Sequence, residues 1–197
     1  MPQQAHTIVY QNVQSERMRR LFAETLSAYP RLRPHPIYLR KLPMRYSTMR
    51  AQPVLNWQFF HRATRHYRVD FSNHLEITEF VKMRELPREV IVGWFAHELG
   101  HIVDYLDRPL RGMIAFGLGY ALWSRYMREA ERRADTIAVN HGFGAEILAT
   151  KRFLMDNAAL PPHYRQRLNK YYLSADEIEA LILAYEEHGE TPDIVPI

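Results

Sequence analysis

Residues 94–105, WFAHELGHIVDY, place His97, Glu98 and His101 in an otherwise apolar segment. Residues i and i+4 lie one above the other on a helix, so His97 and His101 point the same way if the segment is helical. Two imidazoles at this spacing reach one zinc ion at about 2.0–2.1 Å, and Glu98, one residue further round, meets a water molecule instead of the ion. The stretch therefore predicts a helix that carries a metal site.

The surroundings of this motif predict a long, buried helix. Pro87 is tolerated in a first helical turn, and Glu85 and Glu89 favour the positive end of a helix. We expect the helix to end near Asp107, before Pro109. Ionisable groups in an apolar helix cost free energy unless they are satisfied. Metal coordination satisfies both histidines at once; the alternative is separate hydrogen bonds to neighbouring residues.

A downstream segment, REAERRADTIAV at 128–139, offers a third metal ligand. Glu131 and Asp135 again have i, i+4 spacing, and the small side chains of Ala134 and Ala138 on the same face leave room for close approach of the first helix. Glu131 would bind zinc, and Asp135 would accept a hydrogen bond from the far nitrogen of a ligand histidine. Glu129, the competing ligand, projects about half a turn away. The alternative is an exposed charged face that pairs with Arg128, Arg132 and Arg133.

The first part of the chain reads as a mixture of strands and one helix. A strand is predicted at 7–12, a helix at 15–29, and short extended pieces with turns at 31–65, including VLNWQFF. Apolar and polar residues alternate over 66–77, and only Asn73 interrupts the pattern, which predicts a strand. One face of this strand would be polar and exposed to solvent, which suits a position at the margin of a sheet.

The second part reads as nearly all helix. Residues 113–140 predict one long helix ended by the turn HGFG, and 145–157 and 175–188 predict two more, the last with a capping box formed by Ser174 and Glu177. The fold class is therefore α+β. We expect one domain over 1–197, in which 1–86 form a small mixed sheet packed on the metal-binding helix and 87–197 form the helical part that carries the site.

The composition excludes several kinds of chemistry. The 197 residues contain no cysteine and no GxSxG motif, so thiolate metal ligands and the usual cysteine and serine nucleophiles are excluded. The first residues lack the features of a secretory signal, and the longest apolar run, Met113–Trp123, is shorter than the roughly 20 residues that span a bilayer. We expect a cytoplasmic protein with no transmembrane segment, with peripheral membrane contact by the apolar run as the alternative.

Charge is distributed unevenly along the chain. Residues 1–70 contain 12 Lys or Arg against 3 Asp or Glu, whereas residues 71–197 contain 14 against 19. A basic first third attracts nucleic acid or an acidic polypeptide. A solvated basic face is the interpretation that we favour, so nucleic acid is only the second choice of partner.

HELGH at 97–101 followed by ERRAD at 131–135 resembles the gluzincin type of zinc metallopeptidase, in which HExxH precedes a glutamate in an ExxAD-like signature. The resemblance is greatest to the HtpX-like and CaaX-protease-like branch, although the membrane-spanning helices common there are missing. The ImmA/IrrE type of regulatory protease is second; it has a similar AHELGH helix but commonly Asn where Asp135 stands. The match covers about 90–154, and it implies a zincin-like fold.

The resemblance also implies the roles of single residues. His97, His101 and Glu131 match the zinc ligands, Glu98 the general base and Asp135 the acid that supports a ligand histidine. The implied activity is zinc-dependent hydrolysis of peptide bonds in a peptide or protein substrate. Substrate would bind by strand addition, for which 67–73 is the candidate strand. The candidate donors to the oxyanion are Tyr171, Tyr172, His163 and His141.

Two alternative functions stay open. In the first, the chain is a zincin-fold regulatory or nucleic-acid-associated module that binds its partner through the basic first third. In the second, the zinc is purely structural and the protein is a scaffold. A structural site requires a fourth protein ligand. The candidates for that ligand are His74, His141 and His163.

Overall fold

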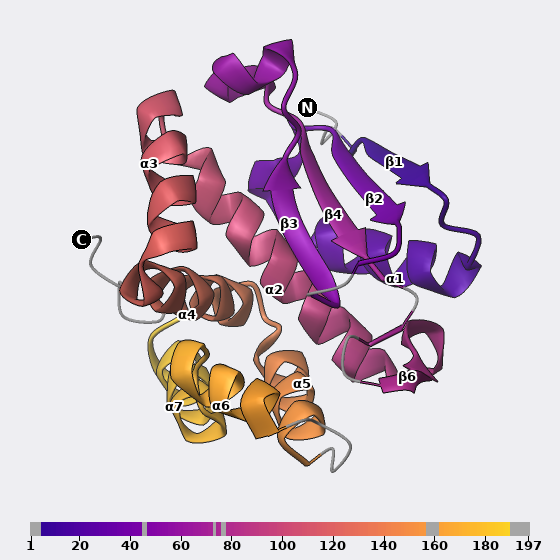
Figure 1. Cartoon of the computed structure of the whole chain (residues 1–197), viewed down its shortest axis with the longest axis vertical. Helices are drawn as coiled ribbons and strands as arrows, with labels where there is room; N and C mark the ends of the chain where they lie inside the picture. Colours follow the sequence, from indigo (N-terminus) through magenta and orange to yellow (C-terminus); the bar gives the residue numbers. More distant parts are fainter. Residues whose placement is uncertain (1–4, 45–46, 73, 76–77, 157–161, 190–197) are drawn as a thin grey trace.

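The computed structural model describes residues 5–44, 47–72, 74–75, 78–156 and 162–189. A small mixed sheet is followed by a mostly helical remainder (Figure 1), so the α+β prediction is confirmed. The elements of the first part are β1 (Ile8–Gln11), α1 (Glu16–Ser27), η1 (Pro30–Leu32), β2 (Ile37–Lys41), β3 (Met49–Pro53), η2 (Trp57–Phe60), η3 (Arg62–Thr64), β4 (Tyr67–Phe71), β5 (His74–Leu75), β6 (Thr78–Lys82) and η4 (Met83–Glu85).

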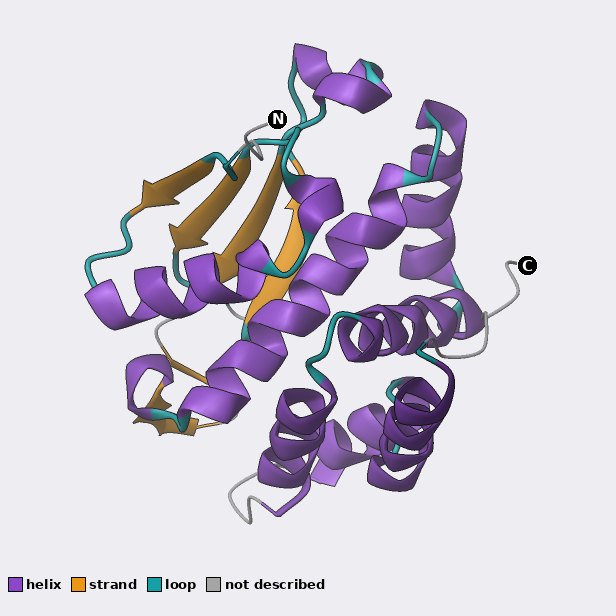
Figure 2. Ribbon diagram, turned by 180° about the vertical axis from the view of Figure 1, so that it is seen from behind, coloured by secondary structure: helices purple, strands orange, loops and turns teal. Residues whose placement is uncertain are grey.

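The described part of the main sheet has four strands in the order β1-β2-β4-β3. Strands β1, β2 and β4 are parallel, and β3 runs antiparallel to β4. Figure 2 shows α1 and the long helix α2 (Arg88–Leu106) on the same face of this sheet. Alternate strand residues such as Leu39, Val69 and Ala51 point into the core between sheet and helices, because side chains alternate between the two faces of a strand.

The position of β4 corrects one prediction. The strand expected at a sheet margin pairs with β2 on one side and β3 on the other, so it lies in the interior. Its polar side chains misled the prediction, since Asp70 is fully buried and held by Arg40 at 2.7 Å and Arg50 at 3.4 Å. Asn73 lies outside the described residues. The edge strand of the described sheet that lies next to α2 is β3, not β4.

Helix α2 is the central element of the fold. Every residue from Val90 to Leu106 is buried, because the helix packs against β3, β4, α1, α4 and α5. This explains why the segment is apolar nearly all round. The predicted helix from about 87 to 107 is confirmed, and the chain leaves it at Asp107.

The second part consists of helices around α2. They are α3 (Leu110–Leu122), α4 (Ser124–Asn140), α5 (Gly144–Asp156), α6 (Pro162–Tyr171) and α7 (Ala175–His188). The single helix predicted over 113–140 is wrong, because Trp123 adopts an extended conformation and divides it into α3 and α4. The helix predicted at 175–188 is confirmed together with its capping box, and Gly189 ends it with a left-handed backbone.

Smaller differences concern local structure. Trp57–Phe60 form a 3₁₀ helix instead of an extended piece, and neither β6 nor α6 was expected from the sequence. Among the described residues, the structure contains no helix with the length and apolarity that a membrane crossing requires. Whether the whole chain is one domain stays a prediction.

Candidate metal centre

Helices α2 and α4 bring two histidines and one glutamate together. The metal-binding atoms of His97, His101 and Glu131 all lie within 4.8 Å of one another, and all three residues are buried. His97 Nε2 is 3.0 Å and His101 Nε2 is 3.5 Å from the same oxygen, Oε2 of Glu131. Within the described residues this is the one group of its kind. Both rings therefore direct the same nitrogen at one point between the helices.

Close packing of the two helices creates this arrangement. A Cβ atom at Gly100 would lie only 2.5 Å from the carbonyl oxygen of Ala134, so the backbones approach each other directly at this point. Ala134 and Ala138 are fully buried, as expected for the small-residue face of α4. Because Glu131 and Asp135 share that face, both carboxylates point at α2.

The alternative of an exposed charged face on α4 is wrong. Glu131 and Asp135 are both buried, and the neighbouring arginines bind elsewhere: Arg132 contacts Glu177, and Arg133 contacts Asp104. Glu129 lies outside the cluster and accepts a hydrogen bond from Arg125 at 3.0 Å, which agrees with its predicted exclusion.

A second set of contacts holds His97 and Glu131 in place. His97 Nδ1 donates a hydrogen bond to Asp135 Oδ1 at 2.7 Å, and Lys151 Nζ on α5 forms an ion pair with Asp135 Oδ2 at 3.1 Å. The Tyr120 hydroxyl on α3 donates to Glu131 Oε1 at 2.5 Å. The predicted hydrogen bond between Asp135 and a candidate ligand histidine is therefore present in the structure.

The charges of this cluster are strongly coupled. Burial alone would lower the pKa of His97, but the carboxylates of Asp135 and Glu131 raise it to about 10. Burial would raise the pKa of Glu131, yet the two histidines hold it well below its usual range. In the same way Lys151 and His97 lower the pKa of Asp135 against the effect of burial. Both carboxylates are therefore held in their charged forms by Lys151 and a protonated His97, and a metal ion that binds between the helices has to displace the proton from His97 Nε2.

The geometry fits a zinc ion. Two ligand atoms about 2.0–2.1 Å from a tetrahedral zinc ion lie about 3.3–3.4 Å apart, close to the 3.0 and 3.5 Å separations from Glu131 Oε2. Hydrogen bonding holds the proposed ligand atom of His101 only weakly, since Nε2 is at the outer limit of a hydrogen bond to Glu131. The far nitrogen, Nδ1, is buried without a hydrogen-bond partner among the described residues, and zinc at Nε2 would not change this.

Glu98 lies beside the cluster but is not part of it. It is buried, lines the same cavity as His97, and accepts a hydrogen bond from the backbone N–H of Ala51 on β3. Burial raises the pKa of its carboxyl group above the usual value, in part against the opposing effect of the two histidines. A carboxylate with a raised pKa is suited to take up and release a proton near neutral pH.

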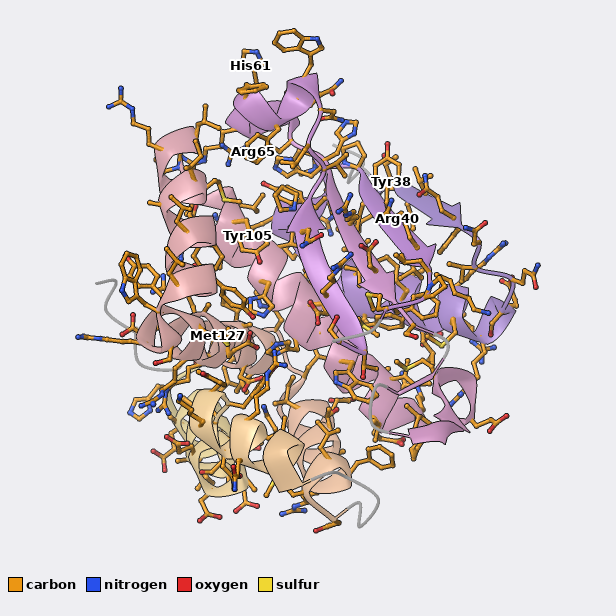
Figure 3. The ribbon with its side chains drawn as sticks, in the orientation of Figure 1. Tyr38, Arg40, His61, Arg65, Tyr105 and Met127 are labelled. Carbon is orange, nitrogen blue, oxygen red and sulfur yellow. The ribbon has the colours of Figure 1, made fainter. Side chains whose placement is uncertain are left out.

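A cavity of about 510 Å³ opens onto these groups. Residues of β3, α2, α3, α4, α5 and α6 line it, and Tyr105 projects from α2 into the region between β3 and α3 (Figure 3). Thr48 and Val54 flank the two ends of β3. The Thr48 carbonyl oxygen accepts a hydrogen bond from the Ser72 N–H, and the Val54 N–H donates to the His66 carbonyl oxygen, so both face β4. Antiparallel pairing alternates, so the backbone groups of Met49 and Ala51 face away from the sheet, toward the cavity.

The structure separates the other predicted site residues. Tyr172 lines the cavity, with its ring 5.8 Å from the ring of His97, whereas Tyr171 is not among the lining residues. His141 is at the end of α4, stacked on Tyr29, and takes no part in the cluster. The side chains of His74 and His163 lie outside what the structure describes.

Sequence reasoning missed Tyr120 and Lys151. Tyr120 reaches Glu131 from another helix, and Lys151 reaches Asp135 from a third. No motif in the sequence marks either residue, because their roles depend only on how the helices pack. A lysine that is buried against the face of the Tyr172 ring, 4.2 Å away, becomes recognisable only in three dimensions.

Comparisons with known proteins add no relative: no family model, curated protein or solved structure matches the chain.

Proposed function

We propose that the protein is a zinc-dependent peptidase with a zincin-like fold, in which His97, His101 and Glu131 bind the zinc ion. The observation that carries the proposal is the combination of three convergent, buried ligand atoms with a separate buried carboxylate, Glu98, on the same cavity. Three protein ligands leave a fourth position open, which is typical of a catalytic site. A site closed by four protein ligands would be structural.

The proposed reaction is hydrolysis of an amide bond. A zinc ion held there would act as a Lewis acid that lowers the pKa of water and polarises the scissile carbonyl group. Glu98 takes one proton from the attacking water as the new C–O bond forms, and it delivers that proton to the leaving nitrogen as the C–N bond breaks. One water molecule is consumed, and a carboxylate and an amine are released.

Substrate recognition is assigned to β3 instead of the strand predicted from the sequence. Strand β4 has partners on both edges and cannot accept another strand, whereas the outward backbone groups of β3 border the cavity. An extended peptide is proposed to pair with the Met49 backbone and the Ala51 carbonyl oxygen, as in other cases of strand addition, because the Ala51 N–H already donates to Glu98. The hydrogen bond from the Ala51 N–H to Glu98 holds the base beside the proposed position of the peptide.

Tyr172 is the proposed donor to the developing oxyanion. Of the donors considered from the sequence whose side chains are described, it lines the cavity, whereas Tyr171 and His141 do not. A phenol hydroxyl can donate a hydrogen bond to negative charge that develops on the carbonyl oxygen.

The test of the proposed function is Glu98→Gln. Glutamine keeps the size of the side chain but cannot accept the proton, so cleavage of labelled casein by the zinc-loaded protein should fall by about 10²–10⁴-fold. Zinc content, measured by elemental analysis, should stay at the level of the unmodified protein. Unchanged cleavage would remove Glu98 from the mechanism.

A matched control is Glu129→Gln on α4. Glu129 is two residues from Glu131 but pairs with Arg125 outside the cluster, so its loss should leave both zinc content and cleavage unchanged. Glu131→Gln should instead lower zinc content. Equal effects of the two substitutions would contradict the proposed ligand set.

A second candidate function is nucleic-acid binding by a zincin-fold regulatory module. The face of the sheet opposite α1 and α2 carries Tyr38 and Arg40 (Figure 3), together with Arg50 and Arg68 around the buried Asp70. Three arginines against one carboxylate leave this face positive. Fluorescence anisotropy with duplex DNA tests the idea, since phosphate binding weakens steeply as salt increases. Absent or salt-independent binding would reject it.

A further inference from the structure

Helix α3 exposes an apolar surface that nothing in the proposed reaction uses. Ile114, Leu118, Leu122 and the adjoining Trp123 are 54%, 56%, 68% and 59% exposed. Together with Tyr126 they make up half of the ten exposed large hydrophobic residues in the described part of the chain. Contiguous apolar surface of this kind marks an interaction site more often than scattered single residues do.

The exposed residues form one stripe along the helix. Ile114, Leu118 and Leu122 follow each other at intervals of four, so they lie on the same face. Phe116 and Tyr120 on the other side contact each other and line the cavity. The helix is thus apolar on both sides while only one side is covered, which is unusual for a helix at the surface of a protein in water.

Positive charge flanks the stripe. Residues 108–128 contain four arginines and no Asp or Glu. Arg111, Arg125 and Arg128 are exposed, and Arg111 continues the stripe one turn before Ile114. Asp104 and Glu129 outside the segment pair with Arg108 and Arg125, so these two arginines are partly neutralised. The surface next to the apolar stripe is therefore suited to negatively charged groups.

The dimensions favour a lipid surface over a protein. From Ile114 to Leu122 the stripe is about 12 Å long at roughly 1.5 Å per residue, too short to cross a bilayer. The stripe and its aromatic neighbours also contribute far fewer residues than the roughly 20–30 that each side of a stable protein interface contributes. A short apolar helix face with a tryptophan at one end and arginines at both ends is instead typical of a helix that lies in the plane of a membrane interface.

We propose that the outer face of α3 docks onto the surface of an anionic lipid bilayer, with Ile114, Leu118 and Leu122 inserted among the lipid chains. Trp123 lies at the level of the headgroups, and Arg111 and Arg128 contact lipid phosphates. Because α3 also forms one wall of the cavity, docking places the cavity beside the membrane. This inference stands on the exposed residues of α3, Trp123 and the first turns of α4, and it does not depend on the proposed peptidase activity.

Co-sedimentation of the full chain with vesicles tests the proposal. Binding to vesicles of phosphatidylcholine with about 30% phosphatidylserine should exceed binding to phosphatidylcholine alone and decrease as salt is added. The double variant Ile114→Gln/Leu118→Gln should lower the partition coefficient by about tenfold or more. Leu183→Gln on α7 is the matched control, because this residue is 59% exposed and lies far along the chain from the stripe; it should bind as the unmodified protein does.

A second pair of variants tests the charges. Arg111→Gln and Arg128→Gln should each weaken binding to the anionic vesicles about fivefold and leave binding to neutral vesicles unchanged. Thermal unfolding should be the same for all variants, since the substituted side chains are exposed. Absence of binding to anionic vesicles, or equal binding by the Ile114→Gln/Leu118→Gln protein, would overturn the proposal. So would a dimer that this double variant converts to a monomer, because a second copy would then cover the stripe.

Discussion

At the scale of single residues, Asp135 connects the candidate metal site to the rest of the helical part. One carboxylate oxygen accepts the hydrogen bond from His97 Nδ1, and the other pairs with Lys151. The first contact orients the imidazole so that Nε2 points at Glu131, and the second compensates the buried negative charge. Such a supporting carboxylate fixes the tautomer and orientation of a ligand histidine.

Asp135→Asn tests this role. Loss of the charge weakens the hold on His97, so zinc affinity should fall by about 10–100-fold. Competition with a chromophoric chelator measures the affinity. Asp107→Asn is the control, because Asp107 is an exposed aspartate whose ion pairs with Arg31 and Arg62 are remote from the cluster. An affinity equal to that of the control would show that Asp135 does not support a ligand.

The residues of the site differ in how far the sequence predicts them. His97, Glu98 and His101 lie on one helix, where spacing alone fixes their relative positions. Glu131 and Asp135 could be paired with each other by the same rule, and the need for a third ligand, the small-residue face of Ala134 and Ala138, and the resemblance to known peptidases together connected them to α2. Their positions agree with that expectation, while the ligand roles stay a prediction. Tyr120 and Lys151 could not be predicted, because each reaches the cluster from a helix whose packing is not encoded locally.

At the scale of elements, the crossing of α2 and α4 determines the geometry of the cluster. Gly100 on α2 contacts the Ala134 backbone on α4, and any side chain there would push the helices apart. His101 follows Gly100 directly, and Glu131 is one turn before Ala134. The separation of the candidate ligand atoms therefore depends on the absence of a single Cβ atom.

Gly100→Ala tests the importance of this crossing. The added Cβ meets the Ala134 carbonyl oxygen at 2.5 Å, so the helices must move, and the free energy of unfolding should fall by about 1–3 kcal/mol. Zinc affinity should fall as well, because the candidate ligands separate. Urea denaturation and chelator competition measure the two effects.

Gly117→Ala on α3 is the matched control. A Cβ at Gly117 has no neighbouring atom within 4 Å, and alanine is the better helix former, so this variant should be unchanged or more stable by about 0.5–1 kcal/mol. A Gly100→Ala protein as stable as the Gly117→Ala protein would contradict the close contact between α2 and α4.

Elements with strong local signals were predicted well, and elements decided by tertiary packing were not. The start and end of α2 and α7 follow from proline, capping and glycine signals. The break between α3 and α4 has no such signal, since neither glycine nor proline stands at Trp123. Tyr126 packs against Gly119 across the break, so tertiary contacts stabilise a turn that propensity does not predict. The interior position of β4 was missed because arginines from the neighbouring strands β2 and β3 neutralise Asp70.

At the scale of the whole molecule, the sheet half and the helical half are joined along α2 and at the ends of α1 and α4. Tyr29, which follows α1, stacks on His141 at 4.2 Å, and its hydroxyl donates to the Ala96 carbonyl oxygen on α2 at 2.9 Å. Tyr29 is fully buried. This contact ties α1 and α4 to the helix that carries the candidate site.

The contact between Tyr29 and His141 should make the stability of the protein depend on pH. Burial lowers the pKa of His141 below its ordinary value of 6.5, so the unfolded chain binds a proton more readily than the folded protein does. Above pH 6.5, His141 is neutral in both the folded and the unfolded protein, and the folded state has its full stability. As the pH falls from 6.5 toward the lower pKa of the folded protein, the unfolded chain takes up the proton first, so the free energy of unfolding decreases.

His141→Phe keeps the stacking on Tyr29 and removes the titration. Between about pH 7 and pH 5, the free energy of unfolding in a chelator should decrease less for this variant than for the unmodified protein. Urea denaturation at several pH values measures the difference in slope. Parallel curves for the two proteins would show that His141 is not buried in its neutral form.

The most direct test of the central claim is the anomalous difference density of zinc-loaded crystals, measured at the zinc absorption edge. The account predicts one strong peak between α2 and α4, about 2.0–2.1 Å from Nε2 of His97, Nε2 of His101 and a carboxylate oxygen of Glu131, with no fourth protein ligand. No peak at this position, a Glu131 side chain turned away from the ion, or closure of the site by a fourth side chain would contradict a catalytic zinc centre.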